Sequence, residues 1–202
     1  MHLLRLLPAV FVVVAPSCTP VQPPPFVNEG EVITTVELTF TPQGGGEAVQ
    51  FSFADPENDG DPVVDDIVLS AAVDYDLAVR FLNELADPAE DISDEVRDEG
   101  ADHLVLISGS AVAGPAAGDN AAAVVTHAYD DVDDNGLPIG LLHTIVTDAV
   151  GSGELSVLLR HMPPENDAAV KAASTPADFA AGGEAGIGGS TDIDVTFALS
   201  VE

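Results

Sequence analysis

Two acidic turns of the sequence have the oxygen spacing of a calcium-binding loop. In each turn, carboxylate or amide side chains stand at positions one, three and five and a glycine stands at six, as in an EF-hand loop. The candidate ligands are Asp55, Glu57, Asp59 and Asp66 in the first turn and Asp131, Asp133 and Asn135 in the second. Position twelve, where a bidentate acid is needed, is Asp66 in the first turn but Leu142 in the second. Because tight turns also select Asp, Asn and Gly, an ordinary structural turn is the alternative for both.

Histidines are the other candidate ligands, because neutral imidazole is the commonest protein ligand of transition metals. His103 and His161 each stand where a predicted strand ends or is interrupted, and they are the candidate transition-metal ligands. His127 and His143 flank Asn135-Gly136. A two-residue turn there places their rings on opposite faces of the sheet, whereas a three- or five-residue loop places them on one face. A hydrogen-bonded histidine at a strand end is the alternative for each.

The residue patterns that nucleophilic catalysis needs are missing from the sequence. No Gly-x-Ser-x-Gly motif occurs, and the only cysteine is Cys18. Tryptophan is absent and tyrosine occurs twice, which leaves few aromatic surfaces for stacking against carbohydrate. We therefore expect a binding or structural protein rather than an enzyme.

The start of the chain predicts export and lipid attachment. Residues 1–17 contain one arginine, Arg5, and a short apolar run, which is typical of a signal peptide and too short to span a bilayer. Small residues then lead into Cys18 as in a bacterial lipobox, although Pro16 departs from that pattern. We predict a secreted precursor that becomes an outer-membrane lipoprotein through lipid on Cys18, facing the periplasm or the cell surface. An ordinary signal peptide with a chance cysteine is the alternative.

Charge limits the partners that the exported chain can have. Asp and Glu number 35 against 5 Lys and Arg, so the formal net charge is −30. This charge excludes nucleic acid and anionic lipid as extended partners, since both need basic patches. Bound calcium or salt would relieve the repulsion, and a solubilising acidic surface is the simpler alternative. Residues 18–30 contain four prolines and predict a semi-rigid tether between the lipid and the domain.

Alternation of apolar and polar residues predicts β-strands along most of residues 31–202. Five runs show this pattern clearly: 32–40, 49–53, 75–81, 155–160 and 192–201. Residues 42–46 predict a hairpin loop, and Asn135-Gly136 predicts a hairpin turn between residues 122–130 and 139–147.

Three segments depart from the alternation. Residues 87–100 predict a short acidic helix with Ile92 and Val96 on one face, and the Ala- and Gly-rich residues 108–122 and 177–190 predict loops. We therefore predict a single, mainly β domain over residues 31–202. Its expected fold is an antiparallel β-sandwich, immunoglobulin-like or related, of about eight strands with one short acidic helix.

Six segments carry a resemblance to a known group: residues 28–36, 55–61, 83–92, 135–141, 159–161 and 189–195. In these segments the chain resembles uncharacterised bacterial lipoproteins that are sometimes labelled type 1 periplasmic binding fold proteins. The resemblance implies a lipid-anchored envelope protein that works beside TonB-dependent outer-membrane receptors. The label also implies a two-lobed α/β fold, but the strand pattern and the short chain favour a single β domain.

Two functions fit these observations. The first is a lipid-anchored envelope protein that captures a transition metal or small molecule for an outer-membrane transporter, with His103, His161 and the acidic turns as ligands. The second is a structural or adhesive surface module whose acidic loops are stiffened by calcium. Metal analysis of the purified protein separates the two hypotheses.

Overall fold

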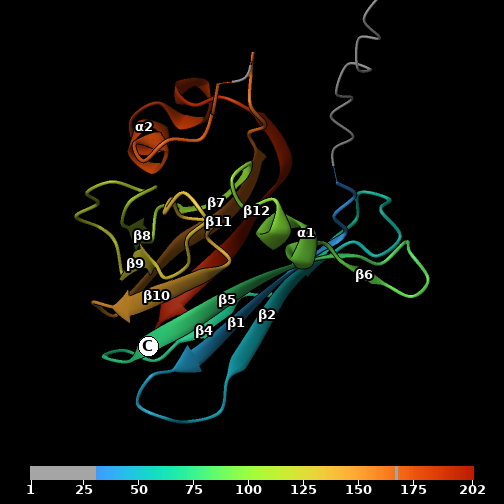
Figure 1. Ribbon diagram of the computed structural model, residues 1–202. Helices are drawn as coiled ribbons and strands as arrows, with labels where there is room; N and C mark the ends of the chain where they lie inside the picture. The colour runs from blue at the N-terminus through green and yellow to red at the C-terminus, as the bar shows by residue number, and fades with distance from the viewer. Residues whose placement is uncertain (1–30, 167) are drawn as a thin grey trace, which may run out of the picture.

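The computed structural model describes residues 31–202 apart from residue 167. Two β-sheets pack against each other, with α1 at one end of the molecule and α2 on the outside of the smaller sheet (Figure 1). The predicted signal peptide, the lipidation site Cys18 and the tether lie outside the described residues. The predicted mainly β fold of packed sheets is confirmed.

The larger sheet collects most strands from the N-terminal two thirds of the chain. Its strands are β1 (Thr35–Pro42), β2 (Val49–Ala54), β3 (Val63–Val64), β5 (Asp74–Asn83), β6 (Glu90–Asp91), β8 (Val112–Ala113), β9 (Val125–Tyr129) and β10 (Leu142–Thr147). They lie in the order β3-β2-β1-β5-β10-β9-β8, with β6 paired to β5. The predicted hairpin between the first two strands is confirmed, since β1 and β2 pair antiparallel across the turn that follows Pro42.

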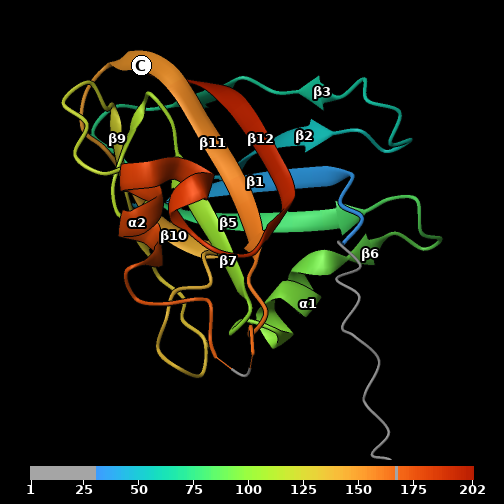
Figure 2. The same cartoon turned by 90° about the horizontal axis from the view of Figure 1, so that it is seen from above.

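The smaller sheet is built around two long C-terminal strands. It contains β4 (Ile67–Leu69), β7 (His103–Ser108), β11 (Gly151–His161) and β12 (Ser190–Val201), in the order β4-β12-β11-β7. In Figure 2, β11 and β12 cross over β1 and β5 of the larger sheet. Most strand pairs are antiparallel, as predicted, but β4 pairs parallel with β12 and β8 pairs parallel with β9.

The core lies between the two sheets and follows from the alternation. Leu38 and Phe40 of β1 and Leu77 of β5 point inward from the larger sheet, and Val157 and Phe197 point inward from the smaller one. All five are at most 1% exposed. Fully burying one such side chain contributes roughly 1.5–3 kcal/mol to stability, so this layer holds the sheets together.

A second apolar layer covers the outer face of the smaller sheet. Leu104 and Leu106 of β7 and Leu158 of β11 pack there with Phe179 of α2 (Thr175–Gly182). α2 and the 3₁₀ turn η1 (Gly183–Gly186) fall in a segment predicted to be a loop, so that prediction was wrong. Pro176 near the start of α2 and the run of alanines favour a helix once Phe179 has an apolar surface to cover.

The predicted acidic helix is present as α1 (Ile92–Asp98). The Asp91 side chain accepts a hydrogen bond from the Ser93 N–H and caps the helix, and Ile92 and Val96 are buried on its inner face. The Ser93 hydroxyl accepts a bond from the Phe81 N–H of β5 at 2.8 Å. This bond locks α1 against the larger sheet and fixes the position of its acidic outer face.

Other details differ from the sequence expectation. The structure has eight strands of five or more residues, which agrees with the predicted number of about eight, but β7 and four strands of two or three residues were not among the predicted runs. Asn135-Gly136 does not form a two-residue hairpin turn, because residues 130–141 form a long loop between β9 and β10. The two-lobed α/β arrangement implied by the resemblance is not what the described residues form. Within the described part, no helix is both long and apolar enough to cross a membrane.

Candidate metal centre

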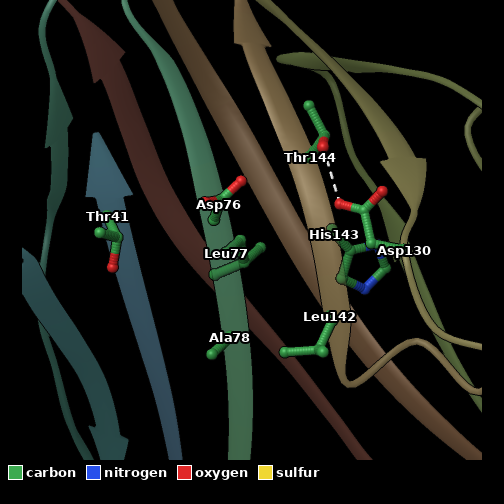
Figure 3. A pocket seen from close by; sticks show the side chains of 8 residues that line it. All are labelled: Thr41, Asp76, Leu77, Ala78, Asp130, Leu142, His143 and Thr144. Atoms are coloured by element: carbon green, nitrogen blue, oxygen red, sulfur yellow. Dashed lines mark hydrogen bonds between the residues drawn. The ribbon is translucent and has the colours of Figure 1, made fainter. Parts of the chain in front are cut away.

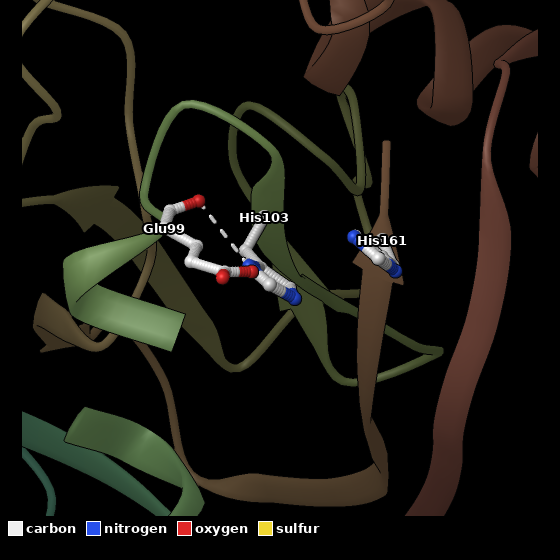
Figure 4. A group of neighbouring side chains, drawn as sticks. All are labelled: Glu99, His103 and His161. Atoms are coloured by element: carbon white, nitrogen blue, oxygen red, sulfur yellow. Dashed lines mark hydrogen bonds between the residues drawn. The ribbon is translucent and has the colours of Figure 1, made fainter. Parts of the chain in front are cut away.

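His103 and His161 face each other across the end of the smaller sheet. They are directly opposed in the antiparallel register of β7 and β11. Figure 4 shows the two side chains, whose rings are stacked. The ring centroids lie 4.7 Å apart and the ring planes are 8° apart. Both stand in the inward-facing series of their strands, with Val105 and Leu159 as the next members. The structure thus brings together the two histidines that the sequence singled out.

A backbone contact fixes which nitrogen of His103 is available. Nδ1 of His103 lies 3.2 Å from the carbonyl oxygen of Glu99 (Figure 4). Because a carbonyl oxygen only accepts, Nδ1 carries the proton and donates, and Nε2 is directed to the other side of the ring. Metal-binding histidines are oriented by this kind of second hydrogen bond.

Two carboxyl groups meet the imidazole of His103. The Glu31 Oε1 atom lies 3.1 Å from Nε2 of His103, and the Glu31 side chain is only 9% exposed. One ligand atom from each of Glu31, His103 and Asp192 falls within 4.8 Å of the others. The second oxygen of Glu31, both oxygens of Asp192 and Nδ1 of His161 are buried without a hydrogen-bond partner among the described residues. Glu31 and Asp192 bond to each other when one of the two carboxyl groups is protonated, so Nδ1 of His161 is the clearest unsatisfied atom of the cluster.

A β-bulge explains why Asp192 reaches this point. Leu159 pairs with Ile193 and Arg160 pairs with Thr191, so Asp192 is an extra residue in β12. In regular alternation Asp192 would share the outer face with Asp194, but a bulge redirects the side chain. Gly189 sits just upstream with φ +81°, and a Cβ there would lie 2.3 Å from the carbonyl oxygen of His161. Only glycine lets the start of β12 approach β11 so closely.

Arg160 fixes the segment that leads into the bulge. Its side chain points to the outer face of the smaller sheet and is almost fully buried. Its guanidinium donates to Glu184 Oε2 at 2.8 Å, to the Thr191 hydroxyl at 2.6 Å, and to the Gly188 and Gly189 carbonyls at 2.8 and 2.6 Å. These four bonds hold the chain on both sides of Ser190 and so position Asp192.

Electrostatics of the cluster reflect closely spaced carboxyl groups. Burial, together with the nearby Glu31 charge, raises the pKa of Asp192 to about 7. Burial also opposes the charged forms of Glu31 and His103, but their mutual hydrogen bond and attraction outweigh it. The pKa of Glu31 is therefore lowered and that of His103 is raised. Both shifts favour the charged forms of the pair, because the Glu31 carboxylate and the His103 imidazolium attract each other.

Two further acids come from the end of α1. Glu95 and Glu99 are four residues apart, on the outer side of the helix. Glu99 forms a ligand-distance group with His103 and His161, and Glu95 and Glu99 form another with Glu31. The complete set therefore contains two imidazoles and four carboxylates. Imidazole with carboxylate suits Zn²⁺, Mn²⁺ or Fe²⁺ rather than Ca²⁺, which takes only oxygen ligands.

The ring stack sets a condition on metal binding. The nitrogen lone pairs of two stacked rings lie in parallel planes. One ring must therefore turn before a nitrogen of His103 and a nitrogen of His161 can bind the same ion. His161 is half-buried and its Nδ1 is without a hydrogen bond, which leaves it the ring that can turn. His103 is fully buried and held by Glu99, so it stays in place.

The carboxylates of the second acidic turn accept hydrogen bonds from backbone N–H groups of their own loop. Asp131 accepts the backbone N–H groups of Gly140 and Leu141 at 2.8 and 2.9 Å. Asp133 Oδ1 accepts those of Asn135 and Leu137, also at 2.8 and 2.9 Å. Asp133 Oδ2 lies 3.0 Å from Nζ of Lys171, and both side chains are nearly fully buried. These contacts close the loop without an ion, and the Asn135 side chain is not drawn into them.

The first acidic turn is organised in a similar way. Asp55 is buried and accepts the N–H groups of Asp59 and Gly60 at 3.0 and 2.9 Å. Glu57, Asp59 and Asp66 are exposed. Among residues 31–202 apart from 167, no group of three ligand atoms within 4.8 Å of one another includes a residue of either acidic turn. The structural alternative for both turns therefore agrees better with the contacts.

His127 and His143 share one face of the larger sheet. The register pairs His127 with Ile145 and His143 with Tyr129, which is the same-face arrangement expected for a longer loop. Both are at most 2% exposed, and their ring centroids lie 5.5 Å apart. Burial lowers the pKa of His127 to about 3 and also lowers that of His143. No carboxylate joins them within ligand distance in the described part of the chain, so they are core side chains.

A surface pocket of about 430 Å³ lies over β5 and β10 (Figure 3). Its two acids are already engaged, since Asp76 accepts from Gln43 at 2.7 Å and Asp130 accepts from Thr144 at 2.7 Å. The other lining residues are three apolar ones, Leu77, Ala78 and Leu142, and three polar ones, Thr41, His143 and Thr144. The pocket is a concave surface in which no reactive side chains converge, so the histidine cluster is the better candidate site.

Sequence reasoning missed four of the six cluster residues: Glu31, Glu95, Glu99 and Asp192. The regular four-residue spacing of Glu95, Glu99 and His103 was the signal that could have found two of them. Glu31 precedes the first strand and Asp192 depends on a bulge, and neither leaves a pattern in the sequence. No family model, curated protein or solved structure matches this chain.

Proposed function

We propose that this protein captures a divalent transition-metal ion through His103 and His161, as a lipid-anchored module of the cell envelope. The observation that supports the proposal is that His103 belongs to two groups whose ligand atoms lie within 4.8 Å of one another, one with Glu99 and His161 and one with Glu31 and Asp192. The signal-like residues 1–17 and Cys18 support the envelope location. An outer-membrane transporter is the recipient that the resemblance implies.

The position of the cluster and the exposure of its outer carboxylates favour reversible binding of an ion over permanent binding of a structural ion. The cluster lies at one end of the smaller sheet, and Glu95 and Glu99 at its edge are exposed. An ion can therefore reach it from solvent without unfolding of the core. The alternative, a structural or adhesive module with calcium-stiffened loops, has less support because the acidic turns close on their own backbone amides.

Metal titration of the purified protein tests the proposal. We expect one tightly held Zn²⁺ by calorimetry against a competing chelator, and nitrogen hyperfine lines from two imidazoles in the EPR spectrum of the Cu²⁺-loaded protein. His161→Ala should weaken Zn²⁺ binding more than about 100-fold, since changes in a second shell alone cost 10–100-fold. Glu57→Gln, in the exposed acidic turn, is the matched control and should bind Zn²⁺ normally.

Two results would reject transition-metal capture. One is a wild-type protein that binds calcium but not Zn²⁺, which would favour the structural alternative. The other is unchanged Zn²⁺ affinity in a folded His161→Ala variant. Because His161 is half-buried, this variant should keep the wild-type far-UV circular dichroism spectrum.

A further inference from the structure

The cluster holds six potential ligands, His103 among them, which is more than one ion needs. They fall into three overlapping groups: Glu99 with His103 and His161, Glu31 with His103 and Asp192, and Glu31 with Glu95 and Glu99. In each group one ligand atom from every member lies within 4.8 Å of the others. Glu31 and Glu99 each belong to an imidazole-containing group and also to the all-carboxylate group. This overlap places two coordination centres side by side.

We infer that a second divalent cation binds at Glu31, Glu95 and Glu99, bridged through Glu31 and Glu99 to the ion at the histidines. The inference rests on the proposed function, since the first ion occupies the His103 and His161 site. Bridged ions lie about 3.5–4 Å apart in known two-metal sites. Two imidazoles with four carboxylates is also the donor set of carboxylate-bridged di-iron and di-manganese proteins.

The buried end of this group is the Glu31 carboxylate. The Glu31 side chain is 91% buried, since 9% of it is exposed, and its Oε2 atom has a donor in the described part of the chain only when Asp192 is protonated and bonds to Glu31. Its other oxygen is held by His103 at 3.1 Å, so the free oxygen is fixed in direction. A buried anionic oxygen without a donor is costly unless a cation or a proton meets it.

Within the described part of the chain, no arginine or lysine neutralises the group, and His103 is the basic side chain that meets it. Among the described residues, all four arginines and lysines are paired with other acids. These are Arg80 with Glu37 and Asp91, Arg97 with Asp94, Arg160 with Glu184, and Lys171 with Asp133. Burial and the neighbouring Glu31 and Glu99 charges raise the pKa of Glu95, which is the effect expected of acids held close together. An all-oxygen set of this charge suits a hard ion such as Mn²⁺.

A titration with Mn²⁺ distinguishes a protein that binds one ion from a protein that binds two. The metal-free protein is titrated with Mn²⁺ at about 0.15 M salt, which screens loose binding to the acidic surface, and free Mn²⁺ is counted by EPR. We expect two tightly bound Mn²⁺ per chain and a spin-coupled spectrum. Glu95→Gln should retain one Mn²⁺, with an uncoupled six-line spectrum. Asp98→Asn removes the same charge from the same helix, outside the cluster, and should retain two.

The outcomes distinguish this inference from the proposed function. A wild-type protein that binds one Zn²⁺ but only one Mn²⁺, without spin coupling, overturns the second site and leaves the first. A second Mn²⁺ that survives Glu95→Gln, or is lost equally in Asp98→Asn, also overturns it. A wild-type protein that binds neither Zn²⁺ nor Mn²⁺ tightly rejects both proposals.

Discussion

His127 is a buried imidazole whose neutral form the fold requires. It is 2% exposed and lies beside His143, and burial lowers its pKa to about 3 from an ordinary value of 6.5. Below pH 6.5 the unfolded chain therefore binds a proton at this position that the folded chain does not. The contribution of the neutral ring is complete above pH 6.5 and is lost progressively as the pH falls towards 3.

This difference between the pKa of His127 in the folded and in the unfolded chain predicts that His127 makes the protein less stable in acid. Between pH 6.5 and 4 the wild type should lose about 3 kcal/mol more unfolding free energy than His127→Leu, at about 1.4 kcal/mol per pH unit. Urea unfolding of both proteins at the two pH values measures the difference. The metal-site carboxyls titrate equally in both proteins and cancel. Parallel losses in the two proteins would show that His127 is protonated without cost in the fold.

At the scale of elements, Lys171 joins three segments that are distant in sequence. Nζ donates to the Gly100 carbonyl at 2.6 Å and lies 3.0 Å from Asp133. It thereby connects the segment before α2, the loop before β10 and the turn between α1 and β7. That last turn leads directly into His103, so the buried pair supports the metal cluster indirectly.

Lys171→Met should be strongly destabilising, because it leaves the Asp133 carboxylate buried without its partner. We expect a loss of about 3–5 kcal/mol in unfolding free energy. The double variant Lys171→Met with Asp133→Asn should recover part of this loss, since the amide oxygen still accepts the Asn135 and Leu137 N–H groups. Chemical denaturation of the three proteins measures this, and equal stability of the single and double variants would contradict it.

Strands were predicted correctly from the sequence where one face of the strand is exposed to solvent. β1, β5 and β12 bury one side chain in two, and their alternation is visible in the sequence. β7 was missed because Leu104 and Leu106 are covered by the α2 layer while Val105 and Ile107 face the core. With both faces buried the alternation disappears.

The site was predictable only in its histidines. His103 and His161 stand out by residue type, and antiparallel pairing of β7 with β11 then sets them opposite each other. Glu31 and Asp192 depend on tertiary approach and on an extra residue in one strand, and a periodic pattern encodes neither.

At the scale of the whole molecule, the net charge of −30 opposes the compact state. Raising the salt concentration from about 0.05 to 0.5 M shortens the screening length from roughly 14 to 4 Å and reduces this repulsion. We expect the unfolding free energy to rise by roughly 1 kcal/mol, which corresponds to a melting temperature about 2–4 °C higher for a chain of this size. Scanning calorimetry of the metal-free protein measures it. A melting temperature that falls with salt would show that attractive ion pairs outweigh the repulsion.

The position of β12 has a consequence for the order of assembly. β12 is the last strand in the chain, yet it lies between β4 and β11 and supplies Val195, Phe197 and Leu199 to the core. A chain that emerges from a ribosome or a translocation pore from its N-terminus exposes the inner face of the larger sheet until this strand arrives. The two-sheet core is therefore completed only after β12 has emerged.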